Sequence, residues 1–295
     1  MTKAACPTTF FTSFSQLKMP DRLTIDTIDA EFAPGARNAV SVCLQLTPEE
    51  RVTIITDEAT RDIAAALRAE VEAIGSEHSV FILENYASRP LTAMPRIILD
   101  DLAQSQVSIF AAQSQPGELA ARREMTAVVD HHGIRHGHMV NISPQIMREG
   151  MRADFKAVDA LSQRLIERAR QAKRITCKTP HGTDFEGEFS PKLKWLKTSG
   201  LISAEKWGNL PGGEIFTAPA NTNGTFVVDG VVGDYLCSEY GDLRDTPLTI
   251  QVRDNRIVDL RCENRYRPGT DSGCAQRRSR LSPTKIGGAR YDYYR

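Results

Sequence analysis

The chain has 295 residues, 41% of them hydrophobic and 25% charged, which is the composition of an ordinary globular protein. Its 37 lysines and arginines balance its 37 aspartates and glutamates, so no net charge draws it to nucleic acid or to an anionic membrane. No stretch approaches the ~20 consecutive apolar residues of a membrane-spanning helix. We therefore expect a globular protein of two domains, with neither a nucleic-acid nor a membrane partner.

The cysteines and the N-terminal sequence indicate a cytoplasmic location. Six cysteines are spread over the whole chain without a Cys-x-x-Cys pair, which favours isolated thiols over a disulfide framework or a zinc knuckle. Residues 1–20 lack the apolar core of a signal peptide. Isolated thiols are typical of a reducing compartment, so we expect the protein in the cytoplasm.

Alternating strands and helices in the first half predict a parallel sheet. Runs of β-branched and apolar residues predict strands at 52–55, 80–83 and 107–111. Helical stretches separate these strands, as crossover connections between parallel strands require. We therefore predict a Rossmann-like parallel α/β domain over residues 35–172, preceded by an N-terminal extension over residues 1–34.

The helix between the first two predicted strands is the clearest in the chain. Its apolar residues recur at helical spacing, and Gly75 ends it as a C-terminal cap. These apolar residues are Ile63, Leu67, Val71 and Ile74. Other helical stretches are predicted at 35–46 and from about Pro95.

The turn after the first predicted strand argues against a dinucleotide site. Residues 56–60 contain no glycine and include the acidic pair Asp57 and Glu58. A dinucleotide loop needs glycines so that the backbone can approach the pyrophosphate, and an acidic turn repels that group. We therefore expect no bound nucleotide.

Four histidines follow Asp130 within a short segment. They are His131, His132, His136 and His138. Four imidazoles this close together could chelate a transition metal. The alternative is a polar loop, because glycine and arginine interleave with the histidines, whereas metal ligands usually come from rigid elements with supporting hydrogen bonds. We favour the loop.

One long helix is predicted over residues 144–173. Its apolar stripe consists of Phe155, Val158, Leu161, Leu165 and Ala169. Such a helix often joins two domains, so we place the domain boundary near its end.

The second half predicts a β-rich domain over residues 173–262. Residues 175–179 and 185–189 are predicted strands joined by a tight turn. Residues 248–252 and 258–262 alternate between apolar and polar side chains, as in a β-hairpin. The fold class expected for the chain is α/β, in which the parallel sheet is followed by a partial, β-rich (α+β) domain.

One carboxylate, Glu214, lies in a constrained backbone. The segment 207–219 around it carries two prolines and three glycines. A loop this constrained fixes the direction of its side chains, as a metal ligand requires. The alternative is a tight turn with a solvated glutamate, and the residues by themselves do not separate the two interpretations.

The segment 209–219 reads Asn-Leu-Pro-Gly-Gly-Glu-Ile-Phe-Thr-Ala-Pro and resembles the first metal-ligand motif of the aminopeptidase T family. These proteins are leucyl-type metalloaminopeptidases. Shorter stretches resemble the family in the same order along the chain, and they are 50–57, Arg89-Pro90, Met94-Pro95, 150–157 with Asp154, and 180–184. The resemblance covers residues 35–262.

The resemblance implies a homodimeric enzyme with two divalent metal ions, either zinc, cobalt or manganese. These ions would activate a water molecule to remove the N-terminal residue of a peptide substrate. It implies Glu214 as one metal ligand. Related members instead bind a single iron and open a dihydroxypyridine ring, so a shared scaffold leaves the chemistry open.

The other metal ligands of the family are missing after residue 262. The family takes a second glutamate, a histidine and a His-x-Asp pair from that region, whereas the last histidine of this chain is His181. One glutamate cannot hold two metal ions. We therefore expect that the metals are not retained and that the chain does not cleave peptides. A non-catalytic peptide-binding relative is the alternative function.

Residues 263–295 form a segment of different composition. They are rich in arginine, serine, glycine and tyrosine and show no helical or strand period. Either a frameshift near residue 262 replaced the catalytic end, or the chain is a naturally shortened relative. Interleaved arginine and tyrosine are also found in RNA-binding segments. We do not favour that function, because a shifted reading frame produces such runs by chance.

Overall fold

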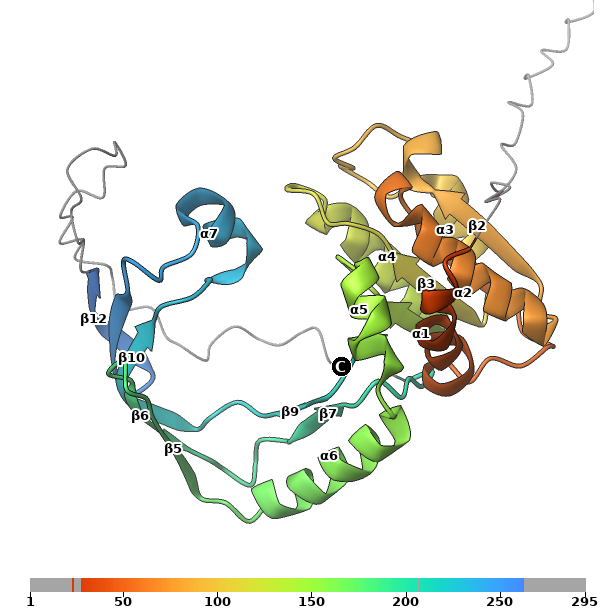
Figure 1. The fold of residues 1–295 in the computed structure, drawn as a ribbon. Coiled ribbons are helices and arrows are strands. Elements are labelled where there is room, and N and C mark those ends of the chain that lie inside the picture. Colours follow the sequence, from red (N-terminus) through yellow and green to blue (C-terminus); the bar gives the residue numbers. More distant parts are fainter. Residues whose placement is uncertain (1–22, 24–27, 206, 263–295) are drawn as a thin grey trace, which may run out of the picture.

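The computed structural model describes residue 23 and residues 28–205 and 207–262. A parallel α/β part and an antiparallel β-rich part stand apart in it, and helix α6 with strands β7 and β9 runs between them (Figure 1). The expected fold class is confirmed, because a five-stranded parallel sheet is followed by antiparallel sheets. The predicted tail 263–295, and residues 1–22 of the predicted N-terminal extension, lie outside the described residues.

The first sheet has the strand order β2-β1-β3-β4-β8, and all its pairs are parallel. Its strands are β1 (Val52–Thr56), β2 (His78–Ile82), β3 (Val107–Ala111), β4 (Arg135–His138) and β8 (Gly208–Asn209). Every residue of β1 and β3 is buried, as expected for central strands covered on both faces. The last strand, β8, is far from the others in sequence, so the segment around residue 208 completes the first sheet.

Helices cover both faces of this sheet. On one face lie α1 (Ala33–Arg37), the helical turn Asn38–Cys43 and α2 (Arg61–Ile74), and on the other lie α3 (Arg96–Leu102) and α4 (Leu119–His132). Helix α2 buries Ile63, Leu67 and Val71 and ends at Gly75, which has φ 90°, so the prediction for this helix is confirmed. Burial of each such side chain stabilises the fold by about 1.5–3 kcal/mol.

The polar loop predicted around the histidines is wrong, because residues 135–138 form strand β4. The strand was missed because it has no β-branched or alternating apolar residues. Its pairing with β3 forms the strand instead, since Ser108 is aligned with His136 and Phe110 with His138. Gly137 faces the opposite side of the sheet, where a Cβ atom added to it would lie 3.1 Å from Leu210 and 3.5 Å from Leu44.

The single long helix predicted over residues 144–173 is also wrong. The segment contains α5 (Pro144–Arg148), a 3-10 turn (Gly150–Arg152) and α6 (Phe155–Ala169). Asp154 begins α6, because its side chain accepts a hydrogen bond from the backbone amide of Ala157.

Only part of the predicted apolar stripe of this helix is buried. Phe155 is fully buried, whereas Leu161 and Leu165 are 50% and 44% exposed. Ser162 and Ile166 are the buried residues further along α6.

The second part contains an antiparallel sheet with the order β12-β11-β10-β6-β5. Its strands are β5 (Arg174–Lys178), β6 (Asp184–Glu188), β10 (Asn221–Val228), β11 (Leu248–Arg253) and β12 (Arg256–Cys262), and α7 (Gly233–Tyr240) lies between β10 and β11. The predicted hairpin is confirmed as β11 and β12. Asp254 and Asn255 form its turn with φ 49° and 60°, the backbone that a two-residue hairpin turn needs.

A separate two-stranded sheet consists of β7 (Leu196–Thr198) and β9 (Glu214–Phe216). Among the described residues, no helix is long and apolar enough to cross a membrane. The predicted domain boundaries at 34, 172 and 262 stay predictions.

Candidate functional site

The loop that carries Glu214 is held by close backbone contacts. A Cβ atom added at Gly212 would lie 2.5 Å from the amide nitrogen of Gly200. Gly200 has φ 89°, and a Cβ there would lie 2.5 Å from the ring of Phe155. Two glycines are thus required for residues 198–200 and 212–214 to pack on each other and on α6. This explains locally why the segment is rich in glycine.

Strand pairing fixes the direction of the Glu214 side chain. Lys197 and Ile215 are aligned in the pair β7–β9, and the Nζ atom of Lys197 lies 2.7 Å from the Asp159 carboxylate of α6. Because successive side chains of a strand point to opposite faces, Glu214 and its aligned residue Thr198 point away from α6. Glu214 is exposed.

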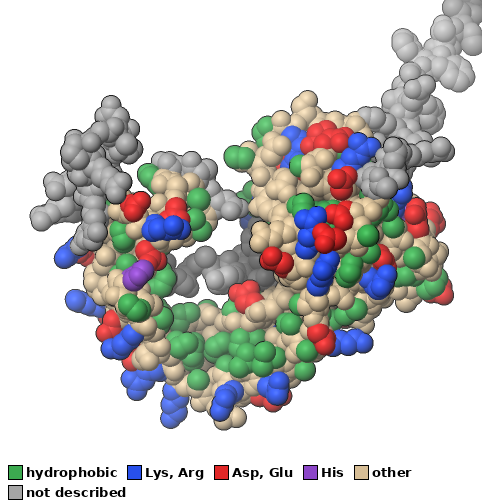
Figure 2. Space-filling view, viewed as in Figure 1, with side chains coloured by type: hydrophobic (Ala, Val, Ile, Leu, Met, Phe, Trp, Pro, Cys, Tyr) green, Lys and Arg blue, Asp and Glu red, His purple; other side chains and the backbone are tan. Residues whose placement is uncertain are grey.

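The face of β7 and β9 opposite α6 borders the space between the two parts of the molecule. Figure 2 shows this side of the molecule as a hollow, with hydrophobic side chains gathered over the segments below it. The constrained loop therefore presents Glu214 as an exposed side chain on the face of β9 opposite α6.

The described residues do not fit a two-metal centre. No group of three or more histidine, cysteine, aspartate or glutamate side chains is placed to hold a metal ion in that part of the chain. A pair of divalent ions needs several carboxylate and imidazole ligands. Glu214 is therefore an isolated candidate ligand in this region.

The four histidines are not brought together as one set. His131 and His132 end helix α4, where their rings contact each other at 4.8 Å, and both are exposed. His136 and His138 are buried on β4. None of them belongs to a group of three metal-ligating side chains within the described region.

His136 and His138 instead form a chain of hydrogen bonds with Ser108. The hydroxyl of Ser108 lies 2.8 Å from Nδ1 of His136, and Nε2 of His136 lies 3.1 Å from Nδ1 of His138. The ring of His138 stacks on Phe110 at 5.2 Å and contacts Trp207 at 5.3 Å. The histidines thus lie between the aromatic residues of a packed core.

Burial controls the charge of both imidazoles. It lowers the pKa of His136 well below its ordinary value, and the neighbouring His138 lowers it further. Burial also lowers the pKa of His138 to about 4, with a smaller contribution from the charge of Arg122. Both rings are therefore neutral at pH 7.

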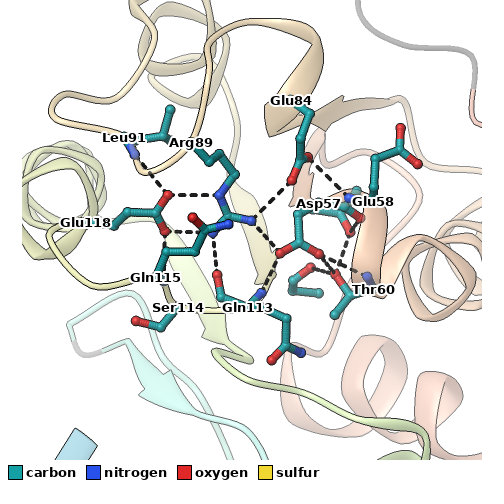
Figure 3. Close-up of polar contacts among 12 residues, drawn as sticks. Asp57, Glu58, Thr60, Glu84, Arg89, Leu91, Gln113, Ser114, Gln115 and Glu118 are labelled. Carbon is teal, nitrogen blue, oxygen red and sulfur yellow. Dashed lines mark hydrogen bonds and ion pairs between the residues drawn. The ribbon is translucent and has the colours of Figure 1, made fainter. Parts of the chain in front are cut away.

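A second polar cluster, centred on the buried Arg89, was not predicted from the sequence. Its guanidinium donates to Glu118 from Nε at 2.8 Å and from Nη2 at 2.6 Å, and Nη1 donates to Asp57 at 2.6 Å (Figure 3). The Arg89, Asp57 and Glu118 side chains are 4%, 1% and 4% exposed. Nη2 also donates to the carbonyl of Gln113, and Nη1 reaches the partly exposed Glu84 at 3.4 Å.

Backbone amides complete this Arg89 cluster. Asp57 accepts from the amides of Thr60 and Gln113, and Glu118 accepts from those of Leu91 and Gln115. Burial by itself would raise the pKa of Glu118, but the hydrogen bonds from Arg89 and the two amides outweigh it and lower that pKa. Hydrogen bonds and charge from Glu118 and Asp57 raise the pKa of Arg89.

The Arg89 cluster lies where the parallel strands end. Asp57 follows β1, Glu84 follows β2 and Gln113 follows β3. Ligands of open α/β sheets commonly bind at this edge, and here the chain's own side chains fill it. The signals in the sequence were the acidic residue after the first strand and the Arg89-Pro90 segment, but neither indicated that the two would meet.

The Asp229 carboxylate forms an ion pair with His181 on the second part of the molecule. The His181 side chain is 70% exposed, and Asp229 follows β10. In the described ranges, neither His181 nor Asp229 belongs to a group of three metal-ligating side chains.

The fold is shared with two solved enzymes. Neither a protein-family model nor a curated protein sequence matches the chain. The 2,5-dihydroxypyridine dioxygenase from Pseudomonas putida KT2440 has a TM-score of 0.58 and 12% identity, over 79% of this chain and 68% of that one. Wild-type AmpT from Thermus thermophilus has a TM-score of 0.56 and 16% identity, over 79% of this chain and 72% of that one.

These similarities define a class by fold. The chain has a distant aminopeptidase-like fold that is also the fold of a dioxygenase. Sequence identity this low establishes the fold, and one fold hosts different chemistries. The reaction must be argued from the side chains.

Proposed function

We propose that this chain is an aminopeptidase-type protein that binds a peptide in the hollow beside Glu214 without hydrolysing it. The observation that supports the proposal is the combination of the AmpT-like fold with a single candidate ligand, Glu214, in the described region. Hydrophobic side chains gather on the surface just below the hollow (Figure 2), and ligand sites are commonly lined by such side chains. The choice of a peptide as the ligand rests on the resemblance to the metalloaminopeptidases.

Glu214 is proposed as a metal ligand in the same protein. Its carboxylate points into solvent from a rigid loop, which suits a ligand that does not need to reorganise. A lone carboxylate binds a zinc, cobalt or manganese ion weakly, so the chain is expected to retain no metal after dialysis. No catalytic step follows from this arrangement.

The first experiment measures hydrolysis and binding on one purified sample. We expect no chelator-sensitive cleavage of leucine-p-nitroanilide with added zinc, cobalt or manganese, and saturable binding of a fluorescent leucine-containing tripeptide to the metal-free protein. Chelator-sensitive cleavage that is lost in Glu214→Gln would contradict the non-catalytic assignment. Absence of tripeptide binding would remove the peptide assignment.

A matched substitution separates the effect of Glu214 from a general change of charge. Glu167→Gln removes the same charge from the exposed side of α6, where Glu167 contacts Gln163. Glu214→Gln should weaken cobalt binding in a spectroscopic titration, and Glu167→Gln should not. A homodimer, which the resemblance also implies, is proposed and is checked by light scattering on the same sample.

The dioxygenase alternative is favoured by the TM-score of 0.58. It needs an iron centre, which typically takes two histidines and a carboxylate. The described residues do not fit that set, because the adjacent nitrogens of His136 and His138 hydrogen-bond to each other. An oxygen-electrode assay with ferrous iron and 2,5-dihydroxypyridine tests this alternative, and oxygen uptake would replace the peptide proposal.

A further inference from the structure

Arg122 is a partly buried cation in the first turn of α4. It lies one turn before Met125 and two turns before Val129 on α4, and both of these residues are buried against the sheet. The side chain of Arg122 therefore starts on the sheet-facing stripe of the helix. Its Nε atom is buried and has no hydrogen-bond partner within the described part of the chain. An unsatisfied buried donor is costly, and a bound ion or ligand commonly explains one in a native protein.

The hydrogen-bond chain on β4 supplies a donor beside this cation. Among the described residues, the hydroxyl of buried Ser108 contacts only Nδ1 of His136, so its proton goes to that nitrogen. His136 then carries its proton on Nε2 and donates to Nδ1 of His138. Neutral His138 must hold its own proton on Nε2. This leaves an N–H donor at the outer end of the chain.

Two residues near β8 complete the surroundings of this donor. Asn209 is aligned with His138 in the parallel pair β4–β8, so its exposed amide lies on the same face of the sheet. The ring of Trp207 lies 5.3 Å from that of His138 and 6.2 Å from that of His136. His138 and Asn209 thus lie on one face of the sheet, the face that α4 with Arg122 covers and against which Trp207 packs.

We propose that Arg122, His138 and Asn209 bind a carboxylate group beside the ring of Trp207. The guanidinium fork matches the two oxygens of a planar carboxylate, and the Nε2–H of His138 and the amide of Asn209 are neutral donors. The carboxylate would satisfy the buried Nε of Arg122. This site needs neither Glu214 nor a metal, so it stands or falls independently of the proposed function.

Electrostatic coupling supports the proximity of two of these groups. The charge of Arg122 contributes, after burial, to the low pKa of His138. The packing agrees with this, since Met125 and Val129 of α4 belong to the same buried cluster as Phe110, on which the ring of His138 stacks. Phosphate would bring a second negative charge to a site with one cation, so a carboxylate is the better match.

Trp207 provides a direct probe of the site. The chain has two tryptophans, and Trp195→Phe leaves Trp207 as the single tryptophan, whose emission is excited selectively at about 295 nm, where tyrosine hardly absorbs. We expect sodium acetate, titrated at constant ionic strength with sodium chloride, to change the Trp207 emission saturably. Sodium phosphate should bind at least tenfold more weakly. Equal binding of acetate and phosphate, or a change that does not saturate, would overturn the assignment.

Neighbouring arginines give a matched pair of variants in this background. Arg122→Met should weaken acetate binding at least tenfold, and Arg123→Met, which removes the same charge from the exposed side of α4, should leave it unchanged. His138→Phe keeps a ring for stacking and removes the donor, so it should also weaken binding. Equal acetate affinity in the Arg122→Met and Arg123→Met proteins would overturn the proposal.

A second measurement does not depend on acetate. Long-range proton–nitrogen correlation spectra should show His138 with its proton on Nε2, and Ser108→Ala should disturb the tautomer of His136. Arg122→Met should fold and melt at a higher temperature than Arg123→Met, because it loses an unsatisfied buried donor. A lower melting temperature for Arg122→Met would mean that Arg122 has a partner within the protein, and the site would be rejected.

Discussion

Arg89 and Arg122 both lie near the edge of the sheet where the parallel strands end, but the hydrogen bonding of their guanidinium groups differs. Arg89 is 4% exposed and uses all three guanidinium nitrogens in hydrogen bonds to Asp57, Glu118 and a carbonyl. Arg122 has a buried Nε with no partner in the described region. A buried charge is tolerated when it is paired and hydrogen-bonded. The comparison teaches that the edge at β1 and β3 is filled by the chain itself, whereas near β4 and β8 the described residues leave the buried Nε atom of Arg122 without a partner.

Chain connectivity accounts for this difference. The Arg89 cluster is built from the segments that directly follow β1, β2 and β3, so its acidic and basic residues are delivered by neighbouring loops. The other edge is closed by β8, which comes from a remote segment that brings Trp207 and Asn209. Nothing on that side neutralises Arg122 within the described chain.

The largest effect is expected from breaking the Arg89 cluster. Arg89→Met leaves the buried carboxylates of Asp57 and Glu118 without their cation, which should lower the free energy of unfolding by roughly 3–5 kcal/mol. Urea denaturation at pH 7 measures this loss. Arg96→Met is the control, because Arg96 is 83% exposed in its pair with Asp100 and should cost less than ~1 kcal/mol. A similar small loss for both variants would refute the importance of the cluster.

The two regions should also lose stability in different pH windows. The folded-state pKa of His138 is about 4, below its ordinary value of 6.5. Below pH 6.5 the unfolded chain binds protons that the folded His138 does not, so stability falls as the pH drops toward 4, by roughly 1.4 kcal/mol per pH unit for each such histidine. The pKa of Glu118 is also lowered, but from 4.5, so its contribution is complete above that value and is lost only as the pH falls further.

Chemical denaturation at several pH values between 7 and 4 tests this separation. His138→Gln should flatten the decrease in unfolding free energy across the window, and His131→Gln, which changes an exposed histidine at the end of α4, should leave it as in the parent. An unchanged slope in His138→Gln would contradict a neutral, buried His138.

The smallest expected effect has the opposite sign. Arg122→Met should raise the free energy of unfolding by about 1 kcal/mol, because it removes a donor that is unsatisfied in the free protein. The same urea experiment measures it beside Arg89→Met. A loss of stability instead of a gain would show that Arg122 stabilises the fold as Arg89 does, and the contrast between the two arginines would then be wrong.

Local chemistry made much of the first sheet predictable. The β-branched run at 52–55, the apolar spacing of Ile63, Leu67 and Val71, and the cap at Gly75 each reflect interactions within a few residues, and the structure confirms them. The hairpin around Asp254 and Asn255 was predictable for the same reason, since its strands alternate and its turn is short.

Elements stabilised by distant segments were not predictable in this way. Strand β4 has histidine and glycine where a pattern would require apolar residues, and only its pairing with β3 and β8 makes it a strand. The break at residues 149–154 escaped prediction because the apolar spacing continues through it, while the Asp154 side chain begins a new helix.

The sequence by itself determined the fold class, the constrained loop around Glu214 and the lack of any histidine after His181. Those features depend on composition, periodicity and backbone chemistry. Only the tertiary structure decided that Asp57, Arg89 and Glu118 meet in one buried cluster, that His136 and His138 bond to each other, and that the Nε atom of Arg122 has no partner among the described residues. The residues of the Arg89 cluster are about thirty positions apart, and His136 and His138, although neighbours on one strand, are buried only because helices and β8 pack around β4. No local pattern encodes whether a charge finds its partner.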